Sequence, residues 1–223
     1  MANSSPARTE ILRRIRAATD DAANQAVIEA EWHAIQRDYK VAASVDHAGL
    51  LHQLEDRLLD YDAGVYRTGP EGVRALVGKI LSERGKRKMA MPEGVPADWL
   101  PSGVEFVEDT RGDISVIDAC DGVLTSATLA IAETGTIVLQ DAPGQGRRAV
   151  TLLPDYHLCV VDAANIVQTV PEAMALLQAT AHKATTFFSG PSATADIEMT
   201  RIKGVHGPRF VDVILIVHET AAH

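Results

Sequence analysis

The sequence predicts an α/β fold in which a mostly parallel, mixed sheet carries helices on both faces. Two observations lead to this prediction. Strands such as 157–161 and 214–217 are apolar without interruption, which is typical of parallel strands buried on both sides. They alternate with amphipathic helices that begin at capping residues. With 223 residues, of which 46% are hydrophobic, the chain can bury one sizeable core.

The first sixty residues predict a helical N-terminal arm or layer (1–60) ahead of an α/β domain (61–223). Pro6 suits the start of a helix over 5–18. The apolar face of this helix consists of Ile11, Leu12 and Ile15. The helical pattern continues through 21–60, with leucines at 50, 54 and 58. Because the arm carries no chemical motif, we interpret it as packing on a partner subunit, and a homo-oligomer is one possible assembly.

The α/β pattern begins near Tyr61. Thr68 and Glu71 predict a capping box that opens a helix ending before Gly85, and Thr169 and Glu172 predict a second one. The basic residues at the end of the first helix suit its dipole, with a phosphate site as the alternative. One or two helical turns are predicted at 114–119. The strands are predicted at 64–67, 88–91, 104–107, 123–125, 137–139, 157–161, 185–188 and 210–217.

Glu133, Thr134 and Gly135 form the most conspicuous polar segment, because they stand directly before a buried strand. Ligands in open α/β sheets usually lie at strand ends. Glu133 is the best candidate for a catalytic residue, as a nucleophile or general base, and it also suits a ligand-binding role. The alternative is a glutamate that accepts hydrogen bonds from the N–H groups of a turn. Spacing alone does not choose between these interpretations.

Three further segments offer groups that bind anions. The glycine-rich loop 143–148 carries Arg148, but it is not a P-loop because no Gly-Lys-Ser/Thr sequence ends it. Gly190, Pro191 and Ser192 predict a turn and a helix start, whose free N–H groups suit an anion. Helix capping explains Ser192 better than a role as nucleophile. His206 lies in a loop expected at a sheet end, and it is a stronger site candidate than a histidine inside a strand.

Composition narrows the classes of function. The formal net charge of −9 argues against a nucleic-acid binder, whose affinity comes mostly from neutralising phosphates. The two cysteines, Cys120 and Cys159, cannot supply the four ligands of an ordinary iron–sulfur cluster. No metal-binding histidine spacing and no GxGxxG fingerprint is present, so we expect no metal and no cofactor. We also expect no membrane span, no secretory signal and a cytoplasmic location.

Together, four motifs in order resemble the lactate-utilization protein C family, the LUD domain. They run Ala130–Leu139, Leu153-Pro154 with His157, Gly190–Glu198 and Gly204–Pro208. The resemblance spans about Tyr61 to Val217. It implies the fold of the superfamily that includes sugar-phosphate isomerases and CoA transferases, in which anionic ligands lie at the carboxyl ends of strands. Carried onto this sequence, it implies an anion pocket lined by Glu133, Thr134, Gly135, Arg148, Gly190, Pro191 and Ser192, with His206 nearby.

The resemblance also implies a function. It indicates an accessory component of a system that oxidises L-lactate to pyruvate, in which the iron–sulfur clusters lie on partner proteins. This chain would bind a small anionic ligand and those partners. The alternative is a stand-alone enzyme of the isomerase or acyl/CoA-transfer type that uses Glu133 as base or nucleophile. A ligand-sensing module ranks last, since no DNA-reading helix-turn-helix is evident. An enzyme should pair Glu133 with a second titratable group within about 3 Å in a cleft.

Overall fold

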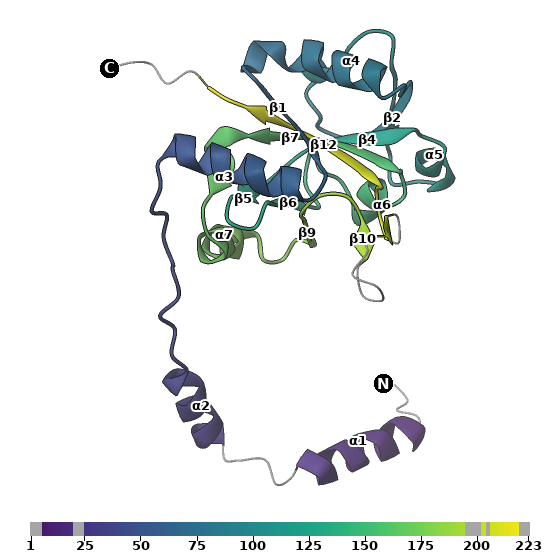
Figure 1. Cartoon of the computed structure of the whole chain (residues 1–223). Helices are drawn as coiled ribbons and strands as arrows, with labels where there is room; N and C mark the ends of the chain where they lie inside the picture. Colours follow the sequence, from purple (N-terminus) through teal and green to yellow (C-terminus); the bar gives the residue numbers. More distant parts are fainter. Residues whose placement is uncertain (1–5, 20–24, 195–201, 204–205, 219–223) are drawn as a thin grey trace. The chain divides into compact units, whose positions relative to one another are not determined.

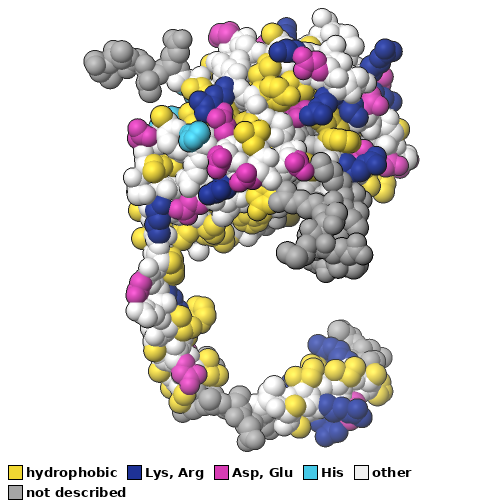
Figure 2. Space-filling model, viewed as in Figure 1, with side chains coloured by type: hydrophobic (Ala, Val, Ile, Leu, Met, Phe, Trp, Pro, Cys, Tyr) yellow, Lys and Arg dark blue, Asp and Glu magenta, His cyan; other side chains and the backbone are white. Residues whose placement is uncertain are grey.

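The computed structural model describes residues 6–19, 25–194, 202–203 and 206–218. The chain divides into two compact units, Met1–Tyr39 and Lys40–His223. The first unit contains helices α1 (Pro6–Thr19) and α2 (Gln25–Ala34), which confirms the predicted N-terminal helix (Figure 1). No described side chain of either helix is buried, and Figure 2 shows hydrophobic side chains exposed along both. Arg37 covers the ring of the exposed Trp32 at 4.9 Å.

The second unit is built on a six-stranded sheet whose neighbouring strands all run parallel, as predicted. Its apolar central strands are almost completely buried, because layers cover both faces of the sheet. In spatial order the strands are β1 (Gly64–Thr68), β12 (Phe210–Ile216), β7 (Tyr156–Asp162), β4 (Gly122–Ser126), β2 (Lys88–Pro92) and β3 (Glu105–Asp109).

Helix α4 (Val73–Glu83) covers one face of this sheet (Figure 1). Helix α3 (His47–Asp60) packs on the opposite face through Leu50, Leu54 and Leu58. The leucines spaced by four therefore belong to the α/β core. The boundary between the units accordingly falls after Tyr39, earlier than the predicted boundary at residue 60. Burying each leucine stabilises the fold by about 1.5–3 kcal/mol.

A second sheet shares the core with α3. Its strands, in spatial order, are β8 (Ile166–Val167), β5 (Leu129–Ile131), β6 (Thr136–Gln140) and β9 (Thr185–Phe188). The β5–β6 and β6–β9 pairs are antiparallel. Alternate residues face opposite sides, so Ile137 joins the α3 core whereas Val138 packs under helix α7 (Val170–Leu177). This sheet positions the Glu133 segment.

Shorter elements complete the unit. They are α5 (Ser115–Asp118), α6 (Arg148–Leu152), the strand pair β10 (Ala193–Thr194) and β11 (Ile202–Lys203), and the 3₁₀ turns η1 (Pro70–Gly72), η2 (Ala97–Trp99), η3 (Ala163–Asn165) and η4 (Gln178–Thr180). In the described part of the chain, no helix is both long enough and apolar enough to cross a membrane.

Two predicted helix starts differ from the structure. The Thr68–Glu71 capping box is wrong, because η1 comes first and α4 begins only after Gly72, without a side-chain cap. The helix start predicted after Gly190 is also wrong, because Ala193–Thr194 pair with Ile202–Lys203 as a β-ribbon. Residues 195–201 lie outside the described residues. The capping box at Thr169 and Glu172 is confirmed at the start of α7.

The end of α4 explains part of the predicted basic cluster. Arg84 donates from Nε and Nη2 to the carboxylate of Asp212 at 2.8 and 2.7 Å. Asp212 is fully buried in β12, and the hydroxyl of Tyr156 donates to it as well at 2.9 Å. Burial, and then this neighbouring carboxylate, raise the pKa of Tyr156. Arg84 therefore pairs with a buried acid. From the sequence, the alternative role for this basic cluster was a phosphate site.

Candidate functional site

Glu133 lies in the four-residue turn, 132–135, that joins β5 to β6. The turn requires glycine at position 135, whose φ is +60°. A Cβ atom at Gly135 would also lie 2.6 Å from Cβ of Arg57 in α3. The backbone N–H of Glu133 donates to the carbonyl of Gln168 at 3.1 Å, so the turn is held on both sides. The predicted segment therefore forms a hairpin turn that rests on the C-terminal half of α3.

The carboxylate of Glu133 has a partner from a distant part of the sequence. Its Oε1 lies 2.7 Å from Nζ of Lys40, and both side chains are about one-third to two-fifths exposed. Glu133 and Thr134 line a hollow of about 510 Å³ together with Arg57, Asp60 and Tyr61. Lys40 is paired with this carboxylate, and Arg57 is paired with Asp56 and Asp60 at 3.5 Å each. The hollow can hold a small polar molecule between the hairpin and the end of α3.

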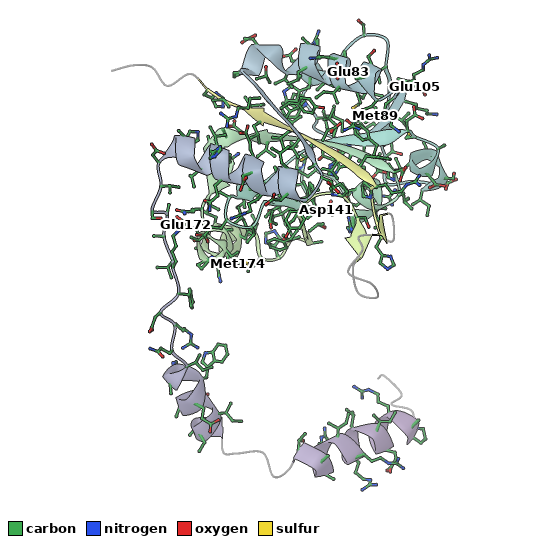
Figure 3. The ribbon with its side chains drawn as sticks, viewed as in Figure 1. Glu83, Met89, Glu105, Asp141, Glu172 and Met174 are labelled. Atoms are coloured by element: carbon green, nitrogen blue, oxygen red, sulfur yellow. The ribbon has the colours of Figure 1, made fainter. Side chains whose placement is uncertain are left out.

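The same lysine belongs to a short segment that is attached to the α/β unit at three points. Besides the Lys40–Glu133 ion pair, the N–H of Ala43 donates to Glu172 Oε1 at 2.9 Å. The N–H of Ser44 donates to the buried Gln168 at 2.6 Å. Glu172 belongs to the capping box of α7 and is labelled in Figure 3. The Lys40–Glu133 pair thus has a structural role whether or not it also acts on a ligand.

A chain of hydroxyl groups leads from the turn to the next candidate. Oγ1 of Thr134 lies 2.7 Å from Oγ1 of Thr136, which lies 2.8 Å from Oγ of Ser189. Gly190 follows, with φ +108°, and a Cβ atom there would lie 2.7 Å from Cβ of Tyr61. Glu133, Thr134, Gly135 and Gly190 therefore gather around the C-terminal end of α3, and Pro191 leads the chain away from it.

The remaining candidates form a separate group. The Oγ atom of Ser192 accepts a hydrogen bond of 3.0 Å from the N–H of the exposed His206. The side chain of Arg148 is exposed at the start of α6, and its Nη1 donates to Thr151 Oγ1 at 3.2 Å. No hydrogen bond or ion pair between described residues joins Arg148 or His206 to Glu133. Of the predicted pocket residues, Glu133 and Thr134 line the hollow beside α3.

His157 is a buried residue of the core, as its position inside a strand indicates. Its Nε2 lies 2.7 Å from Oγ1 of Thr125, and its ring packs on Phe188 with centroids 5.1 Å apart. Burial, with a smaller contribution from the positive charge of Arg148, lowers the pKa of His157 to about 3. The imidazole is therefore neutral at pH 7. It contributes packing and a hydrogen bond to the core between β4 and β7.

The sequence analysis did not identify a second hollow, of about 420 Å³, at the carboxyl ends of β2 and β3. Arg147 donates from Nε and Nη2 to Asp109, both at 2.9 Å, and lowers the pKa of that carboxyl. Arg111 forms an ion pair with Asp141, which is labelled in Figure 3. The sequence feature that could have indicated this hollow is the Glu108-Asp109 pair, which follows the strand predicted at 104–107. Among the described residues, no group of three or more His, Cys, Asp or Glu is placed to hold a metal ion.

Comparison with known proteins identifies the family. The model of the LUD domain matches residues 52–216. A relative named lactate utilization protein C, from Deinococcus radiodurans, is 41% identical over 181 residues, which cover 80% of this chain and 84% of that protein. The chain belongs to the LUD-domain family. Another lactate utilization protein C, from Halalkalibacterium halodurans, is 34% identical over 191 residues, or 79% of this chain and 83% of that one.

A solved structure agrees with the architecture of this LUD domain. The crystal structure of a DUF162 family protein from Deinococcus radiodurans superposes with a TM-score of 0.68 at 35% identity. The superposed region covers 78% of this chain and 100% of the chain in that crystal structure. The LUD match begins within α3, so α1 and α2 lie outside it. The resemblance seen in the four sequence motifs, and the α/β fold expected from it, are confirmed.

Proposed function

We propose that this LUD-domain protein is an accessory, ligand-binding component of a system that oxidises L-lactate to pyruvate. The observation that carries the proposal is the similarity along most of both chains to a protein named lactate utilization protein C, at 41% identity. In this proposal the redox groups belong to iron–sulfur partner proteins. The chain itself contributes a binding site for a small anion and surfaces for those partners.

The cysteines support this division of labour. An ordinary iron–sulfur cluster needs four thiolate ligands, and this chain has two cysteines. Cys120 packs in the cluster under α5, whereas Cys159 lies in the core beneath α3, so the two thiols belong to different parts of the interior. Burial raises the pKa of Cys120, and it raises the pKa of Cys159 to about 12. Both groups are therefore inert thiols at neutral pH.

The proposed ligand site comprises two groups of residues. Glu133, Thr134, Gly135 and Gly190 contribute the group at the end of α3. Its cations are Lys40, which is paired with Glu133, and Arg57, which is paired with Asp56 and Asp60. Arg148, Pro191, Ser192 and His206 contribute the second group, which the segment 189–192 connects to the first. A carboxylate is the chemistry that these cations recognise, and lactate and pyruvate both carry one.

One observation favours a second candidate function, a stand-alone enzyme that uses Glu133 as base or nucleophile. Lys40 Nζ lies 2.7 Å from Glu133 Oε1 beside a hollow, and this meets the geometric condition for a catalytic pair. The attachment of residues 40–44 to the domain accounts for the same contact without any catalysis. The accessory function therefore ranks first.

Growth on L-lactate tests the proposal. We expect a strain that lacks this chain to lose growth on L-lactate and to keep growth on pyruvate. The wild-type chain and the Glu133→Gln variant should both restore growth, because the amide retains the shape of the turn and the accessory role needs no ionised base. Unchanged growth of the deletion strain would refute involvement in lactate utilization. Failure of Glu133→Gln at normal protein levels would favour the enzyme.

A further inference from the structure

The hollow at the carboxyl ends of β2 and β3 has the location of a ligand site. Its lining includes the last residues of both strands, Pro92 and Asp109, and the glycine-rich loop that follows β6. Ligands of parallel α/β sheets lie at the carboxyl ends of strands. The residues that line it are entirely different from those that line the hollow beside Glu133.

Several residues in or next to this hollow have positive φ. Arg111 is one of two non-glycine residues with positive φ among those described, and its φ is +60°. Such a conformation costs about 1–3 kcal/mol and is found mostly at functional sites. Gly94 and Gly146 also have positive φ, and Cβ atoms there would lie 2.7 Å from Pro143 and 2.8 Å from Pro92. The chain is therefore folded tightly around the space while leaving it open.

Two guanidinium groups are fixed in the wall by carboxylates. The almost completely buried Asp109 holds Arg147 in a two-point ion pair and also accepts a 3.0 Å hydrogen bond from the N–H of Arg111. Asp141 holds Arg111. Each arginine thus keeps part of its planar donor group for another acceptor, and its position is set before a ligand arrives. Fixed guanidinium groups of this kind suit a carboxylate on the ligand.

Two further carboxylates in the lining form no ion pair. Among the described residues, no hydrogen bond or ion pair engages the side chain of Glu93 or Glu108, and both side chains are exposed, although the charge of Arg111 also acts on Glu93. With Arg111 and Arg147 each neutralised by its aspartate, these two glutamates give the hollow a net charge of about −2. A simple anion such as lactate would be repelled by that charge. A ligand must bring a cationic group for the glutamates and an acceptor for the arginines.

We propose that this hollow binds a small zwitterion that carries an ammonium and a carboxylate group, as a free α-amino acid does. The ammonium group lies between Glu93 and Glu108, and the carboxylate accepts hydrogen bonds from the unoccupied N–H groups of Arg111 and Arg147. The hollow of about 420 Å³ is large enough for an amino acid with a sizeable side chain. This site is independent of the proposed anion site beside Glu133, and it does not depend on a role in lactate utilization.

Calorimetry with the full-length protein tests the assignment. Each of the common L-α-amino acids is titrated at millimolar concentration, followed by the N-acetyl and amide forms of the tightest binder. We expect at least one amino acid to bind, and both derivatives to bind at least about tenfold more weakly, because each lacks one of the two charges. Absence of binding by all the amino acids, or equal binding of a derivative, would overturn the proposal.

Variants locate the bound amino acid. Glu93→Gln and Glu108→Gln change exposed side chains, so both proteins should fold normally. We expect each to weaken binding about fivefold, because each removes a partner of the ammonium group. The matched control is Glu133→Gln, which changes a glutamate in the other hollow and should leave the affinity unchanged. Unchanged affinity in both hollow variants, or a loss in the control instead, would refute this location.

Discussion

Replacing His157 with glutamine should make the protein less sensitive to acid. The imidazole is buried between β4 and β7, and burial lowers its pKa from the ordinary 6.5 to about 3. The unfolded chain therefore takes up a proton near pH 6.5, whereas the folded chain does not until the pH approaches 3. Between these values, stability falls as the pH falls. Above pH 6.5 the contribution of the neutral imidazole is fully present.

The size of the effect follows from the two pKa values. Where the unfolded chain binds one proton more than the folded chain, the unfolding free energy falls by about 1.4 kcal/mol for each pH unit below the unfolded pKa. Lowering the pH from 7 to 5 should therefore remove about 2 kcal/mol through His157 alone. Glutamine fits a similar space and can bond to Thr125, but it does not titrate. The unfolding free energy of the variant should therefore fall less between pH 7 and pH 5 than that of the wild type, even if it is lower at pH 7.

Urea unfolding followed by circular dichroism at pH 7 and pH 5 measures this difference. We expect the change in unfolding free energy between the two pH values to be smaller in His157→Gln than in wild type by about 2 kcal/mol. The control is His182→Gln, which replaces an exposed histidine and should follow the wild type. Equal pH dependence of wild type and His157→Gln would refute the inference that His157 is held neutral.

Three further tests address separate parts of the structure, two of them with a control substitution. Leu54→Ala should lower the unfolding free energy by about 2–5 kcal/mol in urea melts, and Leu59→Ala, on the exposed face of α3, by less than about 0.5 kcal/mol; equal losses would refute the placement of α3 in the core. Thr169→Ala should cost about 1 kcal/mol by the same assay, whereas Thr68→Ala, which caps no helix, should cost less. Arg148→Ala should weaken calorimetric binding of a carboxylate or phosphate ligand, and an unchanged affinity would remove Arg148 from the proposed anion site.

The parallel sheet could be predicted because the composition of each short strand segment already indicates it. Each central strand is mostly apolar, and such a strand is stable only where both faces are covered. The second sheet was not predicted, although Thr134-Gly135 stands between two apolar runs, a pattern that also indicates a hairpin. The apolar run after Gly135 predicts a strand, but apolar periodicity does not specify which strands it pairs with or in which direction.

The two Thr-x-x-Glu sequences show how local context decides an identical pattern. At Thr169 and Glu172, both reciprocal hydrogen bonds form and α7 begins as predicted. At Thr68 and Glu71, the intervening Gly69-Pro70 and the following Gly72 produce a 3₁₀ turn, and the α-helix starts after it. Glycine destabilises a helix interior, so α4 begins only after Gly72.

The candidate sites depended on contacts that sequence does not reveal. Lys40 reaches Glu133 across 93 positions of the chain, and no periodic pattern connects them. In the glycine-rich loop, adjacent arginines have different roles: Arg147 binds the buried Asp109, whereas Arg148 lies exposed on α6. Which of two neighbouring side chains points inward depends on the backbone of the loop. Composition and spacing therefore identified the loop without identifying the arginine.

Reconstitution of L-lactate oxidation tests the central claim, an accessory role in lactate utilization, most directly. The measurement is the rate of L-lactate oxidation with an artificial electron acceptor in an extract of cells that lack this chain. We predict that adding the purified protein restores the rate, and that the purified protein alone oxidises no L-lactate. Turnover by the isolated protein, or an extract whose rate does not change when the protein is added, would contradict the accessory role.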